Sequence, residues 1–262
     1  FLDNVIDANY YATPEIEAMT KATRKIGLGV MGFADLLIRL RIGYDTESGR
    51  HVGKTIMGFI RDVADNESET LAEERGSFPA WGKSDYAESG QKFRNACRLT
   101  VAPTGTISML ADTSSGVEPT FALAWKKMNI LEGETLYYVN KYFQRDAEKY
   151  GFYSDSLMDH ISNGGSIKSR SDVPDWIKAV YTTATDISPE AHVGMQAAFQ
   201  GACDSGISKT INFANDATLE DVYTAYMLAW ESACKGITVY RSGSRDKEVL
   251  VKANSDSQPV LQ

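Results

Sequence analysis

The most restrictive feature of this sequence is a strand, a helix and a second strand that follow one another within about 35 residues near its end. Residues 206–213, GISKTINF, predict the first strand, and ITVYR at 237–241 predicts the second. Between them, Thr218 and Asp221 form a capping-box pattern and Gly236 is a suitable helix stop. Strands joined in this way lie parallel with a right-handed crossover, so the chain is expected to be α/β with a parallel sheet or barrel.

Composition narrows the class of protein further. The 262 residues are 43% hydrophobic and 24% charged, as in a globular chain that forms one large domain or a major piece of one. A net charge of -8 gives no broad footprint for nucleic acid, and no apolar run is long enough for a membrane span. The three widely spaced cysteines indicate neither a disulfide framework nor a zinc site, which favours a cytoplasmic protein without a bound metal.

A glycine pattern, GLGVMG at 27–32, matches the G-x-G-x-x-G spacing of dinucleotide-binding loops. That function needs an apolar strand directly before the first glycine, whereas EIEAMTKATRK at 15–25 is polar and helical. We therefore interpret the glycines as small residues that allow close packing, between two helices within 14–40.

Periodicity predicts a further helix from about residue 49 to 75. Residues 130–150 are aromatic and are expected to be helical, including the doublet Tyr137 and Tyr138. Residues 151–175 are rich in Ser, Gly and Asp and are expected to form a loop with short turns.

The strongest candidate for chemistry is TVAPTGTIS, where a short strand ends and a helix would begin. The predicted anion-binding residues are Pro103, Thr104, Gly105, Thr106, Ile107 and Ser108. Free N–H groups at a helix start, hydroxyl groups and a glycine that admits an oxygen ligand together favour phosphate binding. An ordinary capped turn is the alternative, and the lysine of a P-loop is missing.

A glutamate, a histidine and three cysteines are the other residues with reactive side chains in suggestive contexts. Glu118 stands in SSGVEP, where the following proline constrains the turn that presents its carboxylate. His192 belongs to HVGMQAAFQ, whose helical spacing favours packing with a histidine at the surface. Cys203 and Cys234 are expected to be small buried hydrophobes, and Cys97 has no base within sequence reach.

Several long motifs in fixed order resemble the large catalytic chain of ribonucleotide reductase, most closely its adenosylcobalamin-dependent class II branch. They are RKIGLGVMGFADLL, TVAPTGTISMLADTSSGVEP, HVGMQAAFQ, SKTIN, NDATLEDV and ACKGITVYRSGSRD. The resemblance implies an α/β fold, namely the C-terminal half of a ten-stranded barrel over residues 1–250, with 251–262 as a polar tail or linker. It also implies that GLGVMG is a tightly packed helical stretch beside the barrel.

In that family a radical route replaces the ribose 2'-hydroxyl with hydrogen. The resemblance implies that Pro103 to Ser108 form the substrate phosphate cradle and that Glu118 and Tyr240 neighbour the active site. The family's radical cysteine lies in an Asn-x-Cys-x-Glu loop, which this sequence lacks. We therefore expect no catalytic residue in this chain and the radical loop upstream of residue 1.

The implied partners are a ribonucleoside di- or triphosphate, the remaining half of the barrel, an external dithiol reductant and adenosylcobalamin as the radical source. Class I relatives pass the radical through two adjacent tyrosines, whereas this strand has Tyr240 followed by Arg241. A fragment of a class I large chain and a non-catalytic nucleotide-binding module remain the alternatives.

Overall fold

The computed structural model describes residues 1–130 and 134–244 of the chain, so the predicted tail at 251–262 lies outside the described residues. Its helices are α1 (Leu2–Ala8), α2 (Pro14–Thr23), α3 (Phe33–Leu40), α4 (Glu47–Arg75), α5 (Asp85–Ser89), α6 (Gly105–Leu110), α7 (Lys141–Lys149), α8 (Asp155–Ser162), α9 (Asp175–Val180), α10 (Pro189–Gln200) and α11 (Leu219–Glu231). Its strands are β1 (Ala124–Ile130), β2 (Glu134–Val139), β3 (Thr210–Phe213) and β4 (Thr238–Arg241), and 3-10 turns occupy Trp81–Lys83, Ile167–Ser169 and Ala184–Asp186.

Four extended segments lie side by side in parallel and form the frame on which the site is built. In order they are residues 26–28, residues 97–101, the stretch from residue 205 through β3, and β4. The N–H of Leu28 donates to the Arg98 carbonyl at 2.8 Å, and the N–H of Ser208 donates to the Val101 carbonyl at 2.9 Å. β3 and β4 pair in parallel and are joined by α11, so the predicted strand, helix and strand are confirmed.

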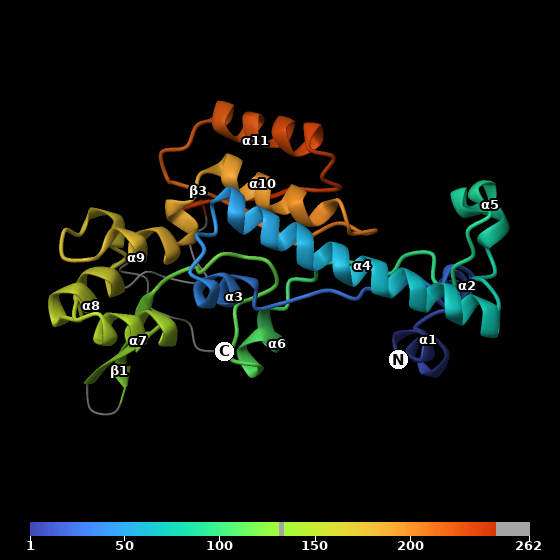
Figure 1. The fold of residues 1–262 in the computed structure, drawn as a ribbon, viewed down its shortest axis with the longest axis horizontal. Coiled ribbons are helices and arrows are strands. Elements are labelled where there is room, and N and C mark those ends of the chain that lie inside the picture. The colour runs from blue at the N-terminus through green and yellow to red at the C-terminus, as the bar shows by residue number, and fades with distance from the viewer. Residues whose placement is uncertain (131–133, 245–262) are drawn as a thin grey trace.

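The two faces of β3 have different surroundings, because side chains alternate along a strand. Ile211 and Phe213 are buried with apolar residues of α10 and α11. Thr210 and Asn212 lie on the opposite, half-buried face. Helices α10 and α11 therefore cover this face of β3, and Figure 1 shows α11 lying above α10.

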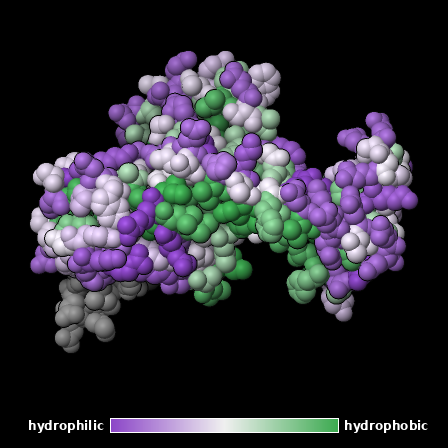
Figure 2. All heavy atoms as spheres, viewed as in Figure 1, coloured by the Kyte–Doolittle hydropathy of each residue, from purple (hydrophilic) through white to green (hydrophobic). Residues whose placement is uncertain are grey.

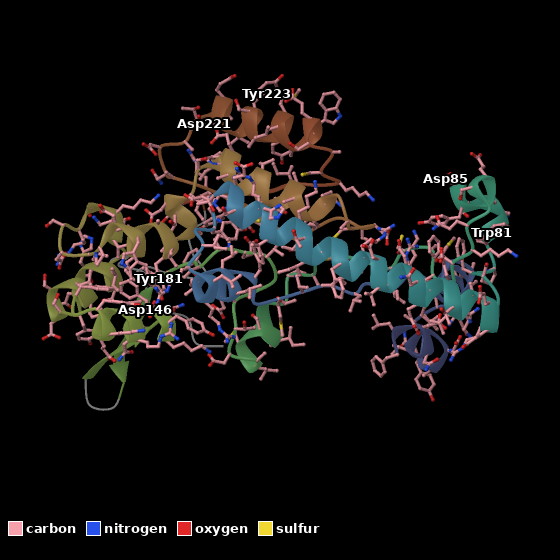
Figure 3. The ribbon with its side chains drawn as sticks, in the orientation of Figure 1. Trp81, Asp85, Asp146, Tyr181, Asp221 and Tyr223 are labelled. Atoms are coloured by element: carbon pink, nitrogen blue, oxygen red, sulfur yellow. The ribbon has the colours of Figure 1, made fainter. Side chains whose placement is uncertain are left out.

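The cap of α11 explains why this helix begins where the sequence predicts. The Thr218 side chain accepts from the Asp221 N–H, and the Asp221 carboxylate accepts from the Thr218 N–H. Together they satisfy N–H groups that a helix start leaves without partners. Figure 3 shows Asp221 at this end of the helix and Tyr223 on its outer face, directed away from the body.

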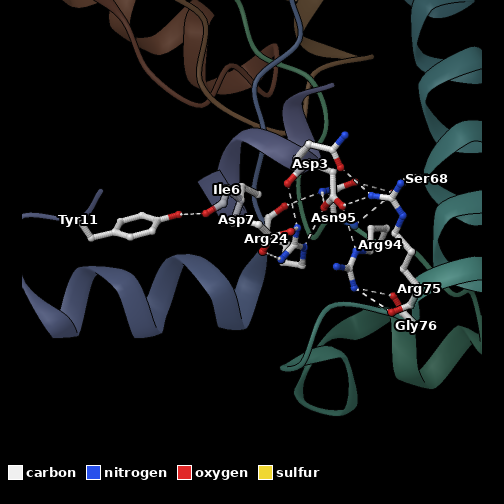
Figure 4. Close-up of polar contacts among 11 residues, drawn as sticks. Asp3, Ile6, Asp7, Tyr11, Arg24, Ser68, Arg75, Gly76, Arg94 and Asn95 are labelled. Carbon is white, nitrogen blue, oxygen red and sulfur yellow. Dashed lines mark hydrogen bonds and ion pairs between the residues drawn. The ribbon is translucent and has the colours of Figure 1, made fainter. Parts of the chain in front are cut away.

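The long helix α4 connects this body to a lobe formed by α1, α2 and α5 (Figure 1). A buried ionic cluster fixes α1 within the lobe (Figure 4): Asp3 accepts from Arg24 at 2.8 Å and from Arg94 at 3.2 Å. Asn95 donates to Asp3 and to the Arg24 carbonyl. Burial raises the pKa of Asp3, but the two guanidinium groups outweigh burial, so its pKa is lowered overall.

The glycine-rich segment at 27–32 is not helical, since Leu28 bridges Leu99 in parallel and Gly32 is left-handed (φ 80°), so the expectation of a helical stretch is wrong. The N–H and carbonyl groups of Leu28 form hydrogen bonds with Arg98 and Thr100, so they are not available for bonds within a helix. The expectation of close packing is confirmed: a Cβ on Gly29 would lie 2.1 Å from the Thr100 carbonyl oxygen, and one on Gly27 would lie 2.6 Å from the Thr100 methyl group. Helices α2 and α3 flank the segment as predicted.

Two other predictions of secondary structure are wrong. Residues 130–139 were expected to be helical, but β1 and β2 form an antiparallel hairpin, and Tyr137 and Tyr138 lie on β2. Only α7 remains of that predicted helix. The expected loop at 151–175 contains α8, whose start is capped by the Ser154 side chain, which accepts from the Leu157 N–H at 3.1 Å.

Helices α7, α8 and α9 form a second lobe with its own core. Tyr181 is fully buried there and donates to the Asp146 carboxylate at 2.7 Å, a pair labelled in Figure 3. Burial and this carboxylate raise the pKa of Tyr181 above its ordinary range. The lobe lies beside the β1–β2 hairpin, and α8 packs against β1.

The close approach of Gly29 to the neighbouring backbone gives a testable prediction. Gly29→Ala should lower the free energy of unfolding by about 1–3 kcal/mol, because the Thr100 carbonyl and its segment would have to move. Gly58→Ala is the matched control: Gly58 lies within α4 and a Cβ there meets nothing within 4 Å. It should raise stability by about 0.5–1 kcal/mol. Denaturant unfolding measures both, and an unchanged midpoint for Gly29→Ala would contradict the account.

Candidate functional site

A cavity of about 820 Å³ opens at the face of β3 that carries Thr210 and Asn212. It lies between the ends of β3 and β4, the segment after α6, and the base of the β1–β2 hairpin with the start of α7. Its polar lining residues are Asp35, Ser108, Asp112, Thr113, Ser114, Ser115, Glu118, Thr120, Asn140, Lys141, Tyr142, Thr210, Asn212 and Tyr240. This volume is in the range of small-molecule sites, and a mostly apolar lining with several hydroxyl and carboxylate groups is typical of such sites.

The predicted anion-binding turn leads into the cavity wall, which begins at Ser108. Thr104 adopts a left-handed conformation (φ 52°) and directs the chain from the extended segment into α6. The first N–H groups of α6, from Gly105 to Ile107, have no partner within the helix and are not part of a strand ladder. A Cβ on Gly105 would meet nothing within 4 Å, so the backbone there is open to an approaching oxygen.

The structure divides the six predicted residues into two groups. Ser108 is buried and lines the cavity, whereas Pro103, Gly105, Thr106 and Ile107 are exposed beside it. Thr104 is half buried. Of the six predicted residues, Ser108 is therefore the one among the residues that line the cavity, and the turn before it lies outside that lining.

Side-chain hydrogen bonds tie this turn to the SSGVEP segment. The Thr104 hydroxyl accepts from the Gly116 N–H at 2.8 Å, and the Ser108 and Ser115 hydroxyls lie 2.8 Å apart. The hydroxyl of the buried Tyr44 also holds this segment, because it donates to the Val117 carbonyl at 2.5 Å. Two segments that the sequence analysis singled out separately therefore form one wall of the cavity.

Glu118 is the carboxylate of that wall. Its Oε2 accepts from Lys209 Nζ at 2.8 Å, and its Oε1 accepts from the Thr210 N–H at 2.6 Å. The side chain remains 26% exposed and lines the cavity. A carboxylate offers about four acceptor positions, so acceptor capacity remains for a ligand.

Lys209 is completely buried, yet all three of its ammonium hydrogens find acceptors. They are Glu118 Oε2 at 2.8 Å, His192 Nδ1 at 2.9 Å and the Thr210 carbonyl at 2.5 Å. Burial lowers the pKa of Lys209, and the Glu118 charge opposes that shift. A buried ammonium with three acceptors is fully satisfied, which is the condition for tolerating a charge in a core.

His192 completes this cluster from α10. Because Nδ1 accepts from Lys209, the hydrogen-bond network assigns the ring proton to Nε2, which lies 3.0 Å from the Ala184 carbonyl. Burial, and secondarily the Lys209 charge, lower the pKa of His192 to about 3, so the ring is neutral. The packing role predicted for this helix face is confirmed, but the predicted surface position of His192 is wrong, since the side chain is 0% exposed.

Tyr240 lies on β4 directly opposite Asn212 of β3, and both residues line the cavity. Glu118 and Tyr240, which were expected as neighbours of the active site, therefore border the same space. They reach it from different elements, the SSGVEP segment and β4.

The cysteines lie elsewhere. All three are free thiols, and none is among the residues that line the cavity. Burial raises the pKa of Cys203 to about 11 and also raises that of Cys234, so both thiols stay protonated at neutral pH. Within residues 1–130 and 134–244, no three His, Cys, Asp or Glu side chains gather as metal ligands, and no helix there could cross a bilayer.

Sequence reasoning missed Lys209, although a signal was present. Along SKTINF the buried register runs through Ile207, Lys209, Ile211 and Phe213, so the lysine occupies an apolar position. A charge is placed in such a register only when a buried partner exists. In the structure that partner is Glu118 of SSGVEP.

The depressed pKa of His192 predicts how stability depends on pH. The unfolded chain takes up this proton near the ordinary pKa of 6.5, whereas the folded chain does so only near 3. The contribution is complete above about pH 6.5 and is lost as pH falls, by up to about 1.4 kcal/mol per pH unit. Denaturant unfolding between pH 7 and 5 should show this slope in the wild type.

His192→Asn removes the titrating ring and should flatten that slope, while an amide oxygen still faces Lys209. The exposed His51 supplies the matched control, because His51→Asn should leave the slope unchanged. Parallel pH profiles for the wild type and His192→Asn would contradict a neutral, buried His192.

The chain is similar in sequence and in fold to known proteins. The chain is 46% identical over 258 residues to a vitamin B12-dependent ribonucleoside-diphosphate reductase of Thermoplasma acidophilum, covering 98% of this chain and 33% of that protein. A protein of the same name from Mycobacterium tuberculosis (strain CDC 1551 / Oshkosh) is 45% identical over 253 residues, covering 97% and 36%. A putative ribonucleoside-diphosphate reductase large subunit of Frog virus 3 is 32% identical over 249 residues, covering 92% and 42%.

Among solved structures, the class Id ribonucleotide reductase alpha subunit of Actinobacillus ureae superposes with a TM-score of 0.75 at 22% identity, covering 92% of this chain and 44% of that one. The chain spans about a third of the length of the first two curated relatives. The family model described as the ribonucleotide reductase barrel domain matches residues 1–93 and 89–240. With its parallel segments, its SSGVEP wall and the turn at 103–108, this chain belongs to the ribonucleotide reductase barrel-domain family and folds as part of that barrel.

Proposed function

We propose that this chain is part of an enzyme that reduces ribonucleotides to deoxyribonucleotides, and that its cavity receives the ribonucleotide. The observation that carries the proposal is the open turn from Thr104 to Ile107, which leads directly into the wall of a cavity of about 820 Å³ at Ser108, in a chain of this family. The names of the Thermoplasma acidophilum and Mycobacterium tuberculosis relatives favour a ribonucleoside diphosphate over a triphosphate as substrate.

The phosphates would bind at the start of α6. The N–H groups of Gly105, Thr106 and Ile107 are available there, and the partial positive charge of a helix start favours anions. The Thr106 hydroxyl is exposed at the same place. The hydrogen bond from the Gly116 N–H to the Thr104 hydroxyl holds the turn in its left-handed conformation before the ligand binds. The loss of conformational entropy on binding is therefore smaller.

The same names support adenosylcobalamin as the radical source, as does the single Tyr240 followed by Arg241. When bound, this cofactor supplies the initiating radical. A cavity of about 820 Å³ suits a nucleotide but not a corrinoid as well, so the described residues do not by themselves form a cobalamin site.

Other parts of the enzyme would come from polypeptide outside this chain. Cys203 is buried with a raised pKa and none of the cysteines lines the cavity, so the radical cysteine and the dithiol reductant are assigned elsewhere. Figure 2 shows an apolar protrusion where α6 lies in Figure 1, and Ile107, Met109 and Leu110 are exposed there. The remaining half of the barrel would cover this surface. Free thiols without disulfides suit a cytoplasmic enzyme.

The phosphate assignment predicts the effect of filling the space at Gly105. Gly105→Val should reduce affinity for a ribonucleoside diphosphate by about tenfold or more, because its methyl groups would occupy the path of a phosphate oxygen to the N–H groups. Such a loss corresponds to about 1.4 kcal/mol or more, comparable to one charge-assisted hydrogen bond. Isothermal titration calorimetry measures it directly.

Gly58→Val is the matched control, since Gly58 is also helical and a Cβ there also meets open space. It should bind the nucleotide as the wild type does. Equal affinity for Gly105→Val and the wild type would remove the turn from the phosphate site.

A further inference from the structure

The cluster of Glu118, Lys209 and His192 is more elaborate than packing requires. Lys209 and His192 are both 0% exposed; Lys209 directly precedes β3, and His192 lies on α10. Glu118 is the member that reaches the cavity, with its side chain 26% exposed. Two buried groups thus stand behind one carboxylate at the cavity wall.

This carboxylate has little freedom to rotate. Each of its oxygens accepts a hydrogen bond from a different atom, Lys209 Nζ at 2.8 Å and the Thr210 N–H at 2.6 Å. Both donors are themselves fixed: Lys209 has three acceptors, and Thr210 lies in β3, paired with β4. The remaining acceptor positions of Glu118 therefore keep one direction relative to the cavity.

The tautomer of neutral His192 fixes the orientation of the Lys209 ammonium. With its proton on Nε2 near the Ala184 carbonyl, Nδ1 offers Lys209 a lone pair and no second positive charge. The ammonium is therefore directed at Glu118 and not repelled from α10. An ordinary core position would hold an apolar residue here, as Ile207 and Ile211 do in the same register.

We propose that Glu118 contacts the ribonucleotide as a fixed hydrogen-bond acceptor, and that Lys209, held by His192, is the positioning residue that orients it. The inference rests on the proposed function, because it assigns a role within the same cavity. A fixed acceptor is matched by the hydroxyl and amino donors of a nucleoside and repels its phosphates. It would direct the nucleoside end of the ligand toward β3 and the phosphates toward α6.

The test is a double-mutant cycle in the full-length reductase that carries this chain, loaded with its cofactor. Ribonucleoside diphosphate reduction gives kcat and KM for the wild type, Glu118→Gln, Lys209→Met and the double variant. Glu118→Gln keeps the size of the side chain but replaces one acceptor oxygen with a donor, and should lower kcat/KM by about 10- to 100-fold. Lys209→Met should produce a similar loss, and the double variant should be no worse than either single variant within about threefold.

Lys178→Met is the matched control, because Lys178 also pairs with a carboxylate, Asp175 at 3.0 Å, but does not line the cavity. It should keep wild-type kcat and KM. Thermal unfolding identifies any variant that does not fold, and in that case the isosteric Glu118→Gln still decides the role of the carboxylate.

The outcomes separate the two proposals. An active wild type with unchanged kcat/KM in Glu118→Gln would overturn the inference alone. Losses that multiply in the double variant would overturn the positioning role, since Lys209 would then act independently of Glu118. A correctly loaded full-length wild type that reduces no ribonucleotide would overturn the proposed function, and the substrate role of Glu118 with it.

Discussion

The buried ammonium of Lys209 is the interaction on which the site depends. It joins three segments that are distant in sequence: the SSGVEP wall through Glu118, α10 through His192, and β3 through its own backbone. Removing one partner of a buried ion pair leaves an uncompensated charge, so these segments keep their positions together. The wall in turn holds the turn before α6 through the bonds between Thr104 and Gly116 and between Ser108 and Ser115.

These contacts bring two chemically different groups to one wall. The start of α6, directly before the cavity-lining Ser108, offers backbone N–H groups with partial positive charge. Within the cavity, Glu118 offers a fixed negative charge near Thr210 and Asn212. A ligand with an anionic end and a hydroxyl-rich end fits such a cavity in one orientation. A ribonucleotide has that chemistry, which agrees with membership of the reductase family.

The sequence predicts the elements whose signals are local. The capping box of α11 and the alternating strands on either side of it can be seen without tertiary information, and they are confirmed. The segment at 27–32 could not be predicted in the same way, because its non-helical form depends on bonds to residues 97–100, far along the chain. The β1–β2 hairpin was mistaken for a helix because aromatic residues suit both structures and its pairing partner decides between them.

The residues of the candidate site likewise differ in whether local sequence signals or tertiary contacts define them. The turn at 103–108, Glu118 and Tyr240 are predicted from motifs, since glycine, proline and hydroxyl residues mark their own backbone geometry. Lys209 was missed, and the burial of His192 was not predicted, because a buried charge is defined by partners that come from other elements. The one local sign of this ion pair is a lysine at a position that alternates with buried apolar residues. Its partner could not be named from the sequence, because the proximity of Glu118 to Lys209 is known only from the fold.

The most direct test of this account is a crystal structure of the protein with a bound ribonucleoside diphosphate. The account predicts phosphate oxygens about 2.7–3.2 Å from the N–H groups of Gly105, Thr106 and Ile107, with the nucleoside extending into the cavity toward Glu118. A nucleotide bound with its phosphates beside Glu118, or outside the cavity altogether, would contradict it.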